Sequence, residues 1–219
     1  MNSIVFLNAF YSDKRGREQI VFENNGTLLK TKIRGFDFSG EDFDCLSIQN
    51  IKNQESLPFN LSKEILIDCK LEIAFHLPVI VSGEEVSGIL YALIELGQKS
   101  PSGGLTHEIL KLSLKYADQE ICSLGNSGFF EDEFLLIQKK LDDKTWIKCC
   151  FNCLYSDYHP AGQGLFGSMM CFQNMKDDYL KVKSKEDFFK IIEKKDRFVQ
   201  ETFLCQKFLK RIPGTGYRG

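Results

Sequence analysis

Four cysteines in the last third of the chain have the residue type and spacing of a metal site. Cys150 and Cys153 form a C-x-x-C pair, Cys171 follows after 17 intervening residues, and Cys205 follows after 33 more. Zinc favours four thiolates in a tetrahedron, and a C-x-x-C pair lets one turn supply two of them. The spacing predicts a zinc site with four cysteine ligands, with Cys149 as an alternative to Cys150. The competing interpretation is four buried hydrophobic residues, because free cysteines are often buried.

The stretch "CLYSDYHP" also contains the residue types of a thiol hydrolase. Cys153 could act as the nucleophile, His159 as the base and Asp157 as the acid that orients the base. Proximity in sequence does not establish such a group, because the cysteine and histidine must meet at hydrogen-bond distance in the fold. A hydrolase that uses these residues is the alternative to a non-catalytic protein.

The stretch "HPAGQGLFG" has the spacing G-x-G-x-x-G at Gly162, Gly164 and Gly167. A dinucleotide site needs a helix directly after these glycines and an acid about 20 residues further on at a strand end. Here an apolar run of strand length follows, and the chain lacks the other motifs of a protein kinase. We therefore expect no nucleotide cofactor, and we interpret the stretch as a tight surface loop.

The segment from Tyr155 to Gly167 combines tyrosines, an acid, a histidine and glycines in one stretch that we expect to be exposed. Loops held by rigid strands are where binding residues concentrate. We predict that this loop forms the binding surface for a protein partner, through Tyr155, Asp157, Tyr158, His159, Gly162 and Gly164.

The C-terminal stretch "RIPGTGYRG" allows two interpretations. It is a loose extension, as chain ends often are, or it folds back so that Tyr217 and Arg218 dock near the loop of residues 155–167.

The first half of the chain has the pattern of antiparallel strands. Apolar and polar residues alternate over residues 65–75 and 109–116, which is typical of half-buried strands. Asn25-Gly26 and the stretch 82–85 predict tight hairpin turns. Residues 144–158 are rich in aromatic and β-type residues and predict one buried strand.

Two helices are expected in the second half. The first follows Ser127, a predicted cap, and buries Phe130, Phe134, Ile137 and Leu141 on one face. The second begins near Ser184, with Asp187 three residues later, and buries Phe188, Ile191 and Ile192.

These elements predict an α+β fold with a largely antiparallel, sandwich-like sheet in the N-terminal part and two packed helices in the C-terminal half. Gly97–Gly104 is the most loop-like stretch of the chain. We therefore divide the chain into a β-rich part, residues 1–100, and an α+β part, residues 101–219, which could form one continuous domain.

Composition excludes a disordered chain, since hydrophobic residues make up 43% of it and phenylalanine occupies 19 positions. Residues 176–219 contain 12 basic and 7 acidic side chains, without the dense basic cluster that nucleic-acid binding requires. No apolar run reaches the roughly 18 residues of a membrane span, and the start lacks a basic leader. We expect a cytoplasmic protein, without a membrane or nucleic-acid partner, whose cysteines are thiols or metal ligands.

Two segments, "CCFNCLYSDYHPAGQGLFGSMMCF" and "VQETFLCQKFLKRIPGTGYRG", resemble a family of bacterial proteins known as a domain of unknown function. The resemblance extends over residues 129–219. It implies a bacterial, intracellular protein and transfers no catalytic residue. Some small families of this kind accompany contact-dependent toxins as immunity proteins, which the resemblance offers as a further hypothesis.

Overall fold

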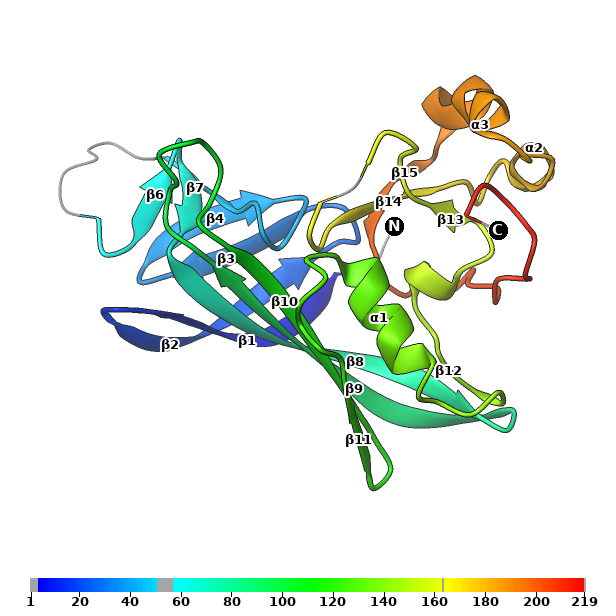
Figure 1. The fold of residues 1–219 in the computed structure, drawn as a ribbon, viewed down its shortest axis with the longest axis horizontal. Coiled ribbons are helices and arrows are strands. Elements are labelled where there is room, and N and C mark those ends of the chain that lie inside the picture. Colours follow the sequence, from blue (N-terminus) through cyan, green and yellow to red (C-terminus); the bar gives the residue numbers. More distant parts are fainter. Residues whose placement is uncertain (1–3, 51–56, 163, 219) are drawn as a thin grey trace.

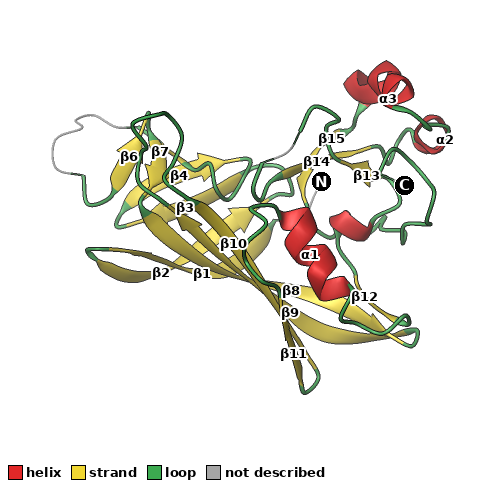
Figure 2. Cartoon of the chain, viewed as in Figure 1, coloured by secondary structure: helices red, strands yellow, loops and turns green. Residues whose placement is uncertain are grey.

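The computed structural model describes residues 4–50, 57–162 and 164–218. Its main feature is a sheet in which twelve described strands take part (Figures 1 and 2). Eleven of them follow the order β11-β10-β9-β8-β1-β2-β3-β4-β5-β7-β6, and β12 pairs with β8. The strands are β1 (Val5–Asp13), β2 (Gly16–Asn24), β3 (Leu29–Ile33), β4 (Phe36–Gly40), β5 (Ser47–Ile48), β6 (Asn60–Ser62), β7 (Ile65–Ile67), β8 (Cys69–Val81), β9 (Glu84–Leu96), β10 (Glu108–Tyr116), β11 (Gln119–Cys122) and β12 (Thr145–Ile147).

The second half of the chain adds a smaller layer (Figure 1). Three short strands form a second sheet in the order β13-β14-β15. The remaining elements are the strands β13 (Ser156–Asp157), β14 (Ser168–Cys171) and β15 (Arg197–Gln200), the α-helices α1 (Phe130–Gln138), α2 (Lys176–Leu180) and α3 (Lys185–Ile191), and the 3-10 helices η1 (Cys150–Asn152) and η2 (Ile192–Lys194). All described strand pairs are antiparallel. The predicted α+β fold, with a largely antiparallel sheet and helices in the C-terminal half, is confirmed.

The large sheet curls back on itself. β7 lies near one end of the strand order, yet the chain passes from β7 into β8 through the single residue Asp68, which adopts a positive φ of 54°. The backbone nitrogen of Asp68 also donates a hydrogen bond to the carbonyl oxygen of Gly97, at 3.0 Å. The curl therefore encloses one face of the sheet, and its apolar side chains form the core.

The predicted hairpins form where turn residues permit positive φ. Ser82 and Gly83 connect β8 to β9 with φ of 51° and 92°, as a tight two-residue turn requires. Gly26, with φ of 92°, lies in the turn between β2 and β3, and Asn25 accepts hydrogen bonds from the backbone nitrogens of Thr27 and Leu28. The alternating burial of β8 and β10 also confirms the predicted half-buried strands.

Gly97–Gly104 lies in the connection between β9 and β10. These two strands pair along nine residues in the same sheet, from Glu108 opposite Leu96 to Tyr116 opposite Gly88. The division of the chain near residue 100 stays a prediction.

Both predicted helices form, but the first ends at Gln138, so the buried Leu141 lies beyond it, and its cap also differs. α1 buries Phe130, Phe134 and Ile137 as expected, but Ser127 precedes the helix and Phe129 occupies the cap position. The buried Glu133 reaches back instead, and it accepts hydrogen bonds from the backbone nitrogens of Gly125 and Ser127. Burial raises the pKa of Glu133, but these and neighbouring hydrogen bonds outweigh it and lower the pKa to about 2.

The second helix begins as its capping pattern predicts. The Ser184 side chain accepts a hydrogen bond from the backbone nitrogen of Asp187 at 3.1 Å. Phe188, Ile191 and Ile192 are buried in a second apolar cluster together with Met170 of β14.

The prediction of one strand over residues 144–158 is wrong. β12 ends at Ile147, η1 turns the chain at Cys150–Asn152, and β13 contains two residues. The Asn152 side chain explains the break, because its amide nitrogen donates to the carbonyl oxygen of Ile147 at 2.7 Å. A local side-chain hydrogen bond of this kind competes with a strand ladder for the same backbone group.

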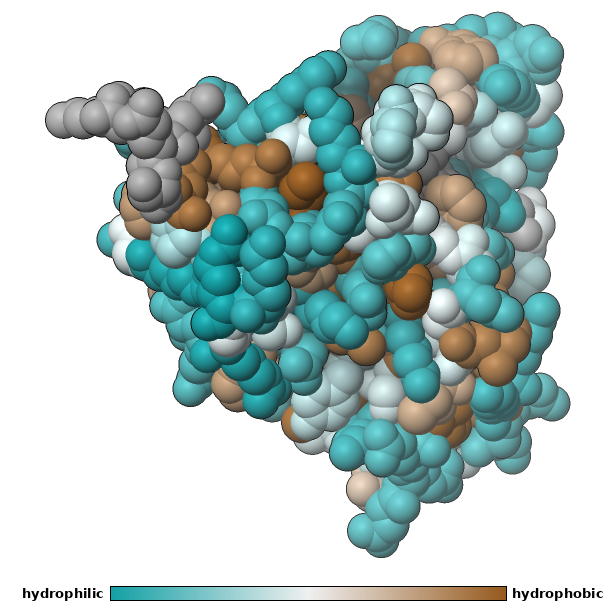
Figure 3. All heavy atoms as spheres, turned by 60° about the vertical axis from the view of Figure 1, so that its left-hand side comes forward, coloured by the Kyte–Doolittle hydropathy of each residue, from teal (hydrophilic) through white to brown (hydrophobic). Residues whose placement is uncertain are grey.

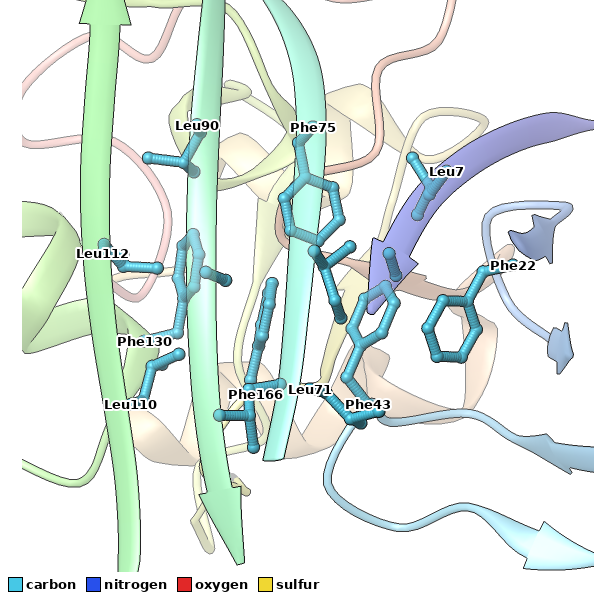
Figure 4. Packing of buried hydrophobic residues seen from close by; sticks show 14 of the residues in the cluster. Leu7, Phe22, Phe43, Leu71, Phe75, Leu90, Leu110, Leu112, Phe130 and Phe166 are labelled. Carbon is cyan, nitrogen blue, oxygen red and sulfur yellow. The ribbon is translucent and has the colours of Figure 1, made fainter. Parts of the chain in front are cut away.

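Phenylalanine rings form the centre of the larger core. Figure 4 shows Phe166 between Phe130, Phe43 and Phe75, beneath the strands β8 and β9. The ring centroid of Phe166 lies 4.8 Å from that of Phe130, 4.9 Å from that of Phe43 and 5.6 Å from that of Phe75. The end of the glycine-containing stretch is thus packed directly on the main sheet.

Among the described residues, no helix combines the length and apolar character needed to cross a membrane.

Candidate functional site

Asp157 is buried and holds the C-terminal tail. Its Oδ2 accepts hydrogen bonds from the Tyr179 hydroxyl at 2.9 Å and from the backbone nitrogens of Tyr217 and Arg218 at 3.1 and 3.0 Å. Of the two interpretations of the tail, the folded-back one is therefore confirmed for the residues up to Arg218.

Two arginines complete the docking of the tail. The Arg218 guanidinium lies 4.2 Å from the centre of the Phe151 ring and donates to the Phe151 carbonyl oxygen. Arg211 donates to the carbonyl oxygen of Ser156 and to the Tyr179 hydroxyl. Buried charges of this kind persist because they are paired or hydrogen-bonded.

Cys153, Asp157 and His159 serve separate structural roles. Cys153 is 4% exposed within the second apolar cluster. Asp157 is engaged by the tail, whereas Nδ1 of His159 accepts from the backbone nitrogen of Ala161 at 3.1 Å. No hydrogen bond joins these three side chains in the part of the chain that the structure describes. The thiol-hydrolase hypothesis thus lacks an assembled triad.

The six residues predicted to bind a partner fall into two groups. Tyr155, Asp157 and Tyr158 are buried, and the expectation of one exposed stretch is wrong for them. The physical reason is packing, because the two tyrosines belong to different apolar clusters that meet at β13. His159 is half-buried, and Gly162 and Gly164 are exposed, so their binding role stays a prediction.

The glycines of the loop meet two separate requirements. Gly162 has a φ of 133°, which side chains rarely adopt. Gly167 lies so close to the Asp42 carboxylate that an added Cβ would overlap it. The interpretation of a tight loop is supported, and the close approach explains why glycine stands at position 167.

Three carboxyl groups gather beneath this loop. Asp42 accepts from the Ser168 hydroxyl at 2.7 Å, and Asp44 accepts from the backbone nitrogen of Phe166 at 3.3 Å. Oε1 of Glu201 accepts from the Tyr158 hydroxyl at 3.1 Å and from the backbone nitrogen of Gly167 at 3.3 Å.

Burial and mutual repulsion raise the pKa values of these acids. Burial and the nearby Asp42 raise the pKa of Asp44 to about 7. Burial raises the pKa of Glu201 to about 8, and Asp42 contributes in the same direction. Glu201 is therefore mostly protonated at neutral pH.

The four predicted zinc ligands come from segments that the backbone brings together. The backbone nitrogen of Cys150 donates to the Phe203 carbonyl oxygen at 2.7 Å, two residues before Cys205. Ser156 pairs with Cys171 across β13 and β14. Burial raises the pKa of the Cys150 thiol, and Cys153, Cys205, Cys149 and Cys171 are near enough to raise it further.

Proximity of the four cysteines does not amount to a formed metal site. Within residues 4–50, 57–162 and 164–218, no three or more His, Cys, Asp or Glu side chains are grouped so that they could hold a metal ion. The four-cysteine zinc site stays a prediction.

A second candidate site lies at the opposite end of the molecule. A groove of about 1090 Å³ opens between the β1–β2 turn, the β6–β7 hairpin and the start of the β9–β10 connection. We call it the partner groove, and its lining residues are Lys14, Leu57, Phe59, Asn60, Leu61, Lys63, Glu64, Ile67, Asp68, Gln98 and Lys99. Figure 3 shows this end of the molecule, where apolar side chains lie in a hollow bordered by hydrophilic ones.

Buried charges support the floor of this end. The Asp13 side chain, 1% exposed, forms an ion pair with Arg34 at 2.6 Å and accepts from the Tyr11 hydroxyl at 2.9 Å. Burial raises the pKa of Asp13, but hydrogen bonds from Arg34, Arg15 and Tyr11 outweigh it and lower the pKa to about 2. Asp13 therefore stays ionised and fixes the β1–β2 turn that carries Lys14.

Sequence reasoning missed the partner groove because its residues come from three distant turns without a shared motif. The sequence contains one signal, since Lys63-Glu64 lies at hairpin spacing between Asn60–Ser62 and the apolar run Ile65–Ile67. In the structure both residues have positive φ, 50° and 70°. Non-glycine residues in this conformation cluster at functional sites.

A family model described as a family of unknown function (DUF6304) matches residues 5–156. No curated protein and no solved structure matches the chain. The match covers the large sheet, α1 and η1. It shares only residues 129–156 with the range on which the sequence resemblance rests.

The first prediction concerns Glu201. The unfolded chain loses this proton near the ordinary value of 4.5, whereas the folded chain keeps it to about pH 8. Between these values the folded state binds more protons, so stability should fall as pH rises, by up to about 1.4 kcal/mol per pH unit. We expect Glu201→Gln to reduce this decline, as measured by urea unfolding at intervals from pH 5 to 9.

Asp44→Asn is the matched control. The raised pKa of Asp44 also makes stability fall as pH rises, but this fall is complete at about pH 7. Only Glu201→Gln should flatten the interval from pH 7 to 8. Identical profiles for the original protein and Glu201→Gln would contradict the assignment.

The second prediction concerns zinc. The cysteine spacing leads us to expect about one equivalent of zinc by elemental analysis, with sulfurs about 2.3 Å from the ion. Cys171→Ser should lose the ion and lower the melting temperature, whereas Cys122→Ser, at an exposed position away from the four, should retain both. If the protein contains no metal and a chelator leaves its melting temperature unchanged, the zinc prediction is contradicted and the four cysteines are buried thiols.

Proposed function

The chain belongs to the DUF6304 family, a family of unknown function, and we propose that it is a non-catalytic binding protein that receives a protein partner in the partner groove. The observation that carries this proposal is the groove itself. It combines an apolar floor with polar side chains at the rim, the composition that binding sites share. The buried ion pair of Asp13 supports one wall and makes it rigid.

The other chemical groups of the molecule support a non-catalytic role. Asp157, Arg211 and Arg218 are occupied with the tail, and Cys153 is buried. A reactive thiol requires access and a lowered pKa. The thiol hydrolase that uses Cys153 and His159 remains the alternative proposal.

The proposal includes a bacterial, cytoplasmic setting. All eight cysteines are free thiols, which supports a reducing compartment. A non-catalytic protein that occupies one partner could act as an immunity protein, and this role is part of the proposal. The exposed loop around Ala161 is the second candidate surface.

Site-specific photocrosslinking tests which surface receives the partner. A benzoylphenylalanine placed at Gln98 in the groove, at Ala161 in the loop or at Gln19 on the outer face of β2 would be illuminated in extract of the source cells. We expect one discrete crosslinked protein from position 98 alone, because a specific partner occupies one surface. Mass spectrometry would then identify that protein.

Binding of the purified partner provides the decisive measurement. Gln98→Trp, which enlarges an exposed side chain on the groove wall, should weaken binding about tenfold or more. Gln19→Trp makes the same change on the outer face and should leave binding unchanged. A partner that crosslinks only from position 161 would place the binding site in the loop. If no position gives a crosslinked protein, the proposal is contradicted.

Alkylation separates the binding protein from the hydrolase. We expect iodoacetamide at neutral pH to modify the exposed Cys45 and Cys122 first, while the buried Cys153 reacts only in urea. Mass mapping over time gives the order of modification. Rapid and selective modification of Cys153 in the folded protein would favour the hydrolase.

A further inference from the structure

We infer that the partner groove recognises an acidic segment of the partner that also carries apolar side chains. This inference rests on the proposed function and adds the chemistry of the bound segment. Its basis is the charge that the groove leaves unpaired.

Three lysines line the groove without an ion-pair partner among the described residues. Lys14 lies in the β1–β2 turn, Lys63 in the β6–β7 turn and Lys99 in the β9–β10 connection. All three are exposed, and no acidic side chain lies within 4 Å of their amino groups in the described part of the chain.

Two acids at this end of the molecule already have cationic partners. Asp13 pairs with Arg34 and Arg15, and Glu95, in the adjoining smaller hollow, pairs with Lys70 at 2.8 Å. Asp68 accepts hydrogen bonds from the side-chain amides of Asn60 and Gln98. These amide donors are neutral, so Asp68 keeps its charge, and the Glu64 carboxylate has no partner among the described residues. The described lining therefore presents three lysines without an ion pair against two carboxylates without one.

The lysines are held at fixed backbone positions. Lys63 occupies a two-residue turn with positive φ, and Lys99 pairs with Leu105 in an isolated bridge. Lys14 follows Asp13, which the buried ion pair immobilises. Fixed cations around a hollow raise the local concentration of anionic ligands and increase the association rate.

The floor selects against a purely ionic ligand. Leu57 and Leu61 are half-buried and line the same groove, so apolar surface lies between the charges. A segment with acidic and apolar side chains close together complements both the lysines and the apolar surface of the groove. A nucleic-acid strand would satisfy the charges alone.

The probe is a fluorescein-labelled peptide of repeated Glu-Glu-Leu units, measured by fluorescence anisotropy at about 50 mM salt, where screening is modest. A Gln-Gln-Leu peptide of equal length is the neutral comparison. We expect saturable binding of the acidic peptide and binding about tenfold weaker for the neutral one.

Matched lysine variants assign the effect to the groove. The triple variant Lys14→Gln, Lys63→Gln, Lys99→Gln should lose the preference for the acidic peptide. The control triple Lys111→Gln, Lys139→Gln, Lys207→Gln removes equal charge from exposed lysines elsewhere and should keep it. Glu64→Gln should strengthen binding about two- to threefold, because it removes one of the two carboxylates without an ion pair. Circular dichroism verifies that each variant is folded.

The outcomes separate this inference from the proposed function. Equal binding of both peptides, weakened by Gln98→Trp, would keep the groove as a binding site and overturn its acidic specificity. No binding of either peptide would overturn the acidic inference, and a natural partner unaffected by Gln98→Trp would overturn the proposed function. If an oligothymidylate binds more tightly than the acidic peptide and its binding depends on the same lysines, the ligand class would be nucleic acid and the inference of an acidic segment would be overturned.

Discussion

The packing of Phe166 is the interaction on which the arrangement of the two halves depends. Its ring contacts Phe130 of α1, Phe75 of β8 and Phe43 of the β4–β5 loop, so one side chain joins three separate segments. Its backbone is fixed as well, because Phe43 donates to its carbonyl oxygen and Asp44 accepts from its nitrogen. The glycines before Phe166 let the chain approach this core closely. The loop thus has a structural role, because it connects the two halves of the chain through Phe166.

Local elements could be predicted from the sequence because their signals are local. The alternation in β8, the Ser82-Gly83 turn and the Ser184 cap each depend on residues a few positions apart. The break at η1 could not be predicted in this way, since it depends on a side-chain hydrogen bond of Asn152 to a backbone group that a strand would otherwise use. The curl that brings β7 to β8 depends on long-range pairing, which local periodicity does not encode.

The chemistry of the candidate site was harder to predict for a related reason. Sequence reasoning found Asp157, because an acid among tyrosines and cysteines resembles a catalytic group, and the structure gives it to the tail instead. Charged side chains in an apolar segment need partners whether they serve stability or catalysis. The residue type therefore indicates that a charged side chain has a partner, and only the fold shows which group that partner is. The groove lysines gave no signal, because each belongs to a different turn.

The tight turns of the large sheet differ in whether they contain glycine. Ser82-Gly83 and Arg34-Gly35 each place glycine at one of their two positive-φ positions, as tight hairpins usually do. Lys63-Glu64 uses no glycine, and the left-handed conformation costs about 1–2 kcal/mol for each such residue. A glycine at either position would relieve that cost but would remove a charged side chain from the groove wall. Strain that persists where a less strained residue is available favours the hypothesis that the side chains have a role. This conformational cost connects the local structure of one hairpin to the proposed binding role of the groove.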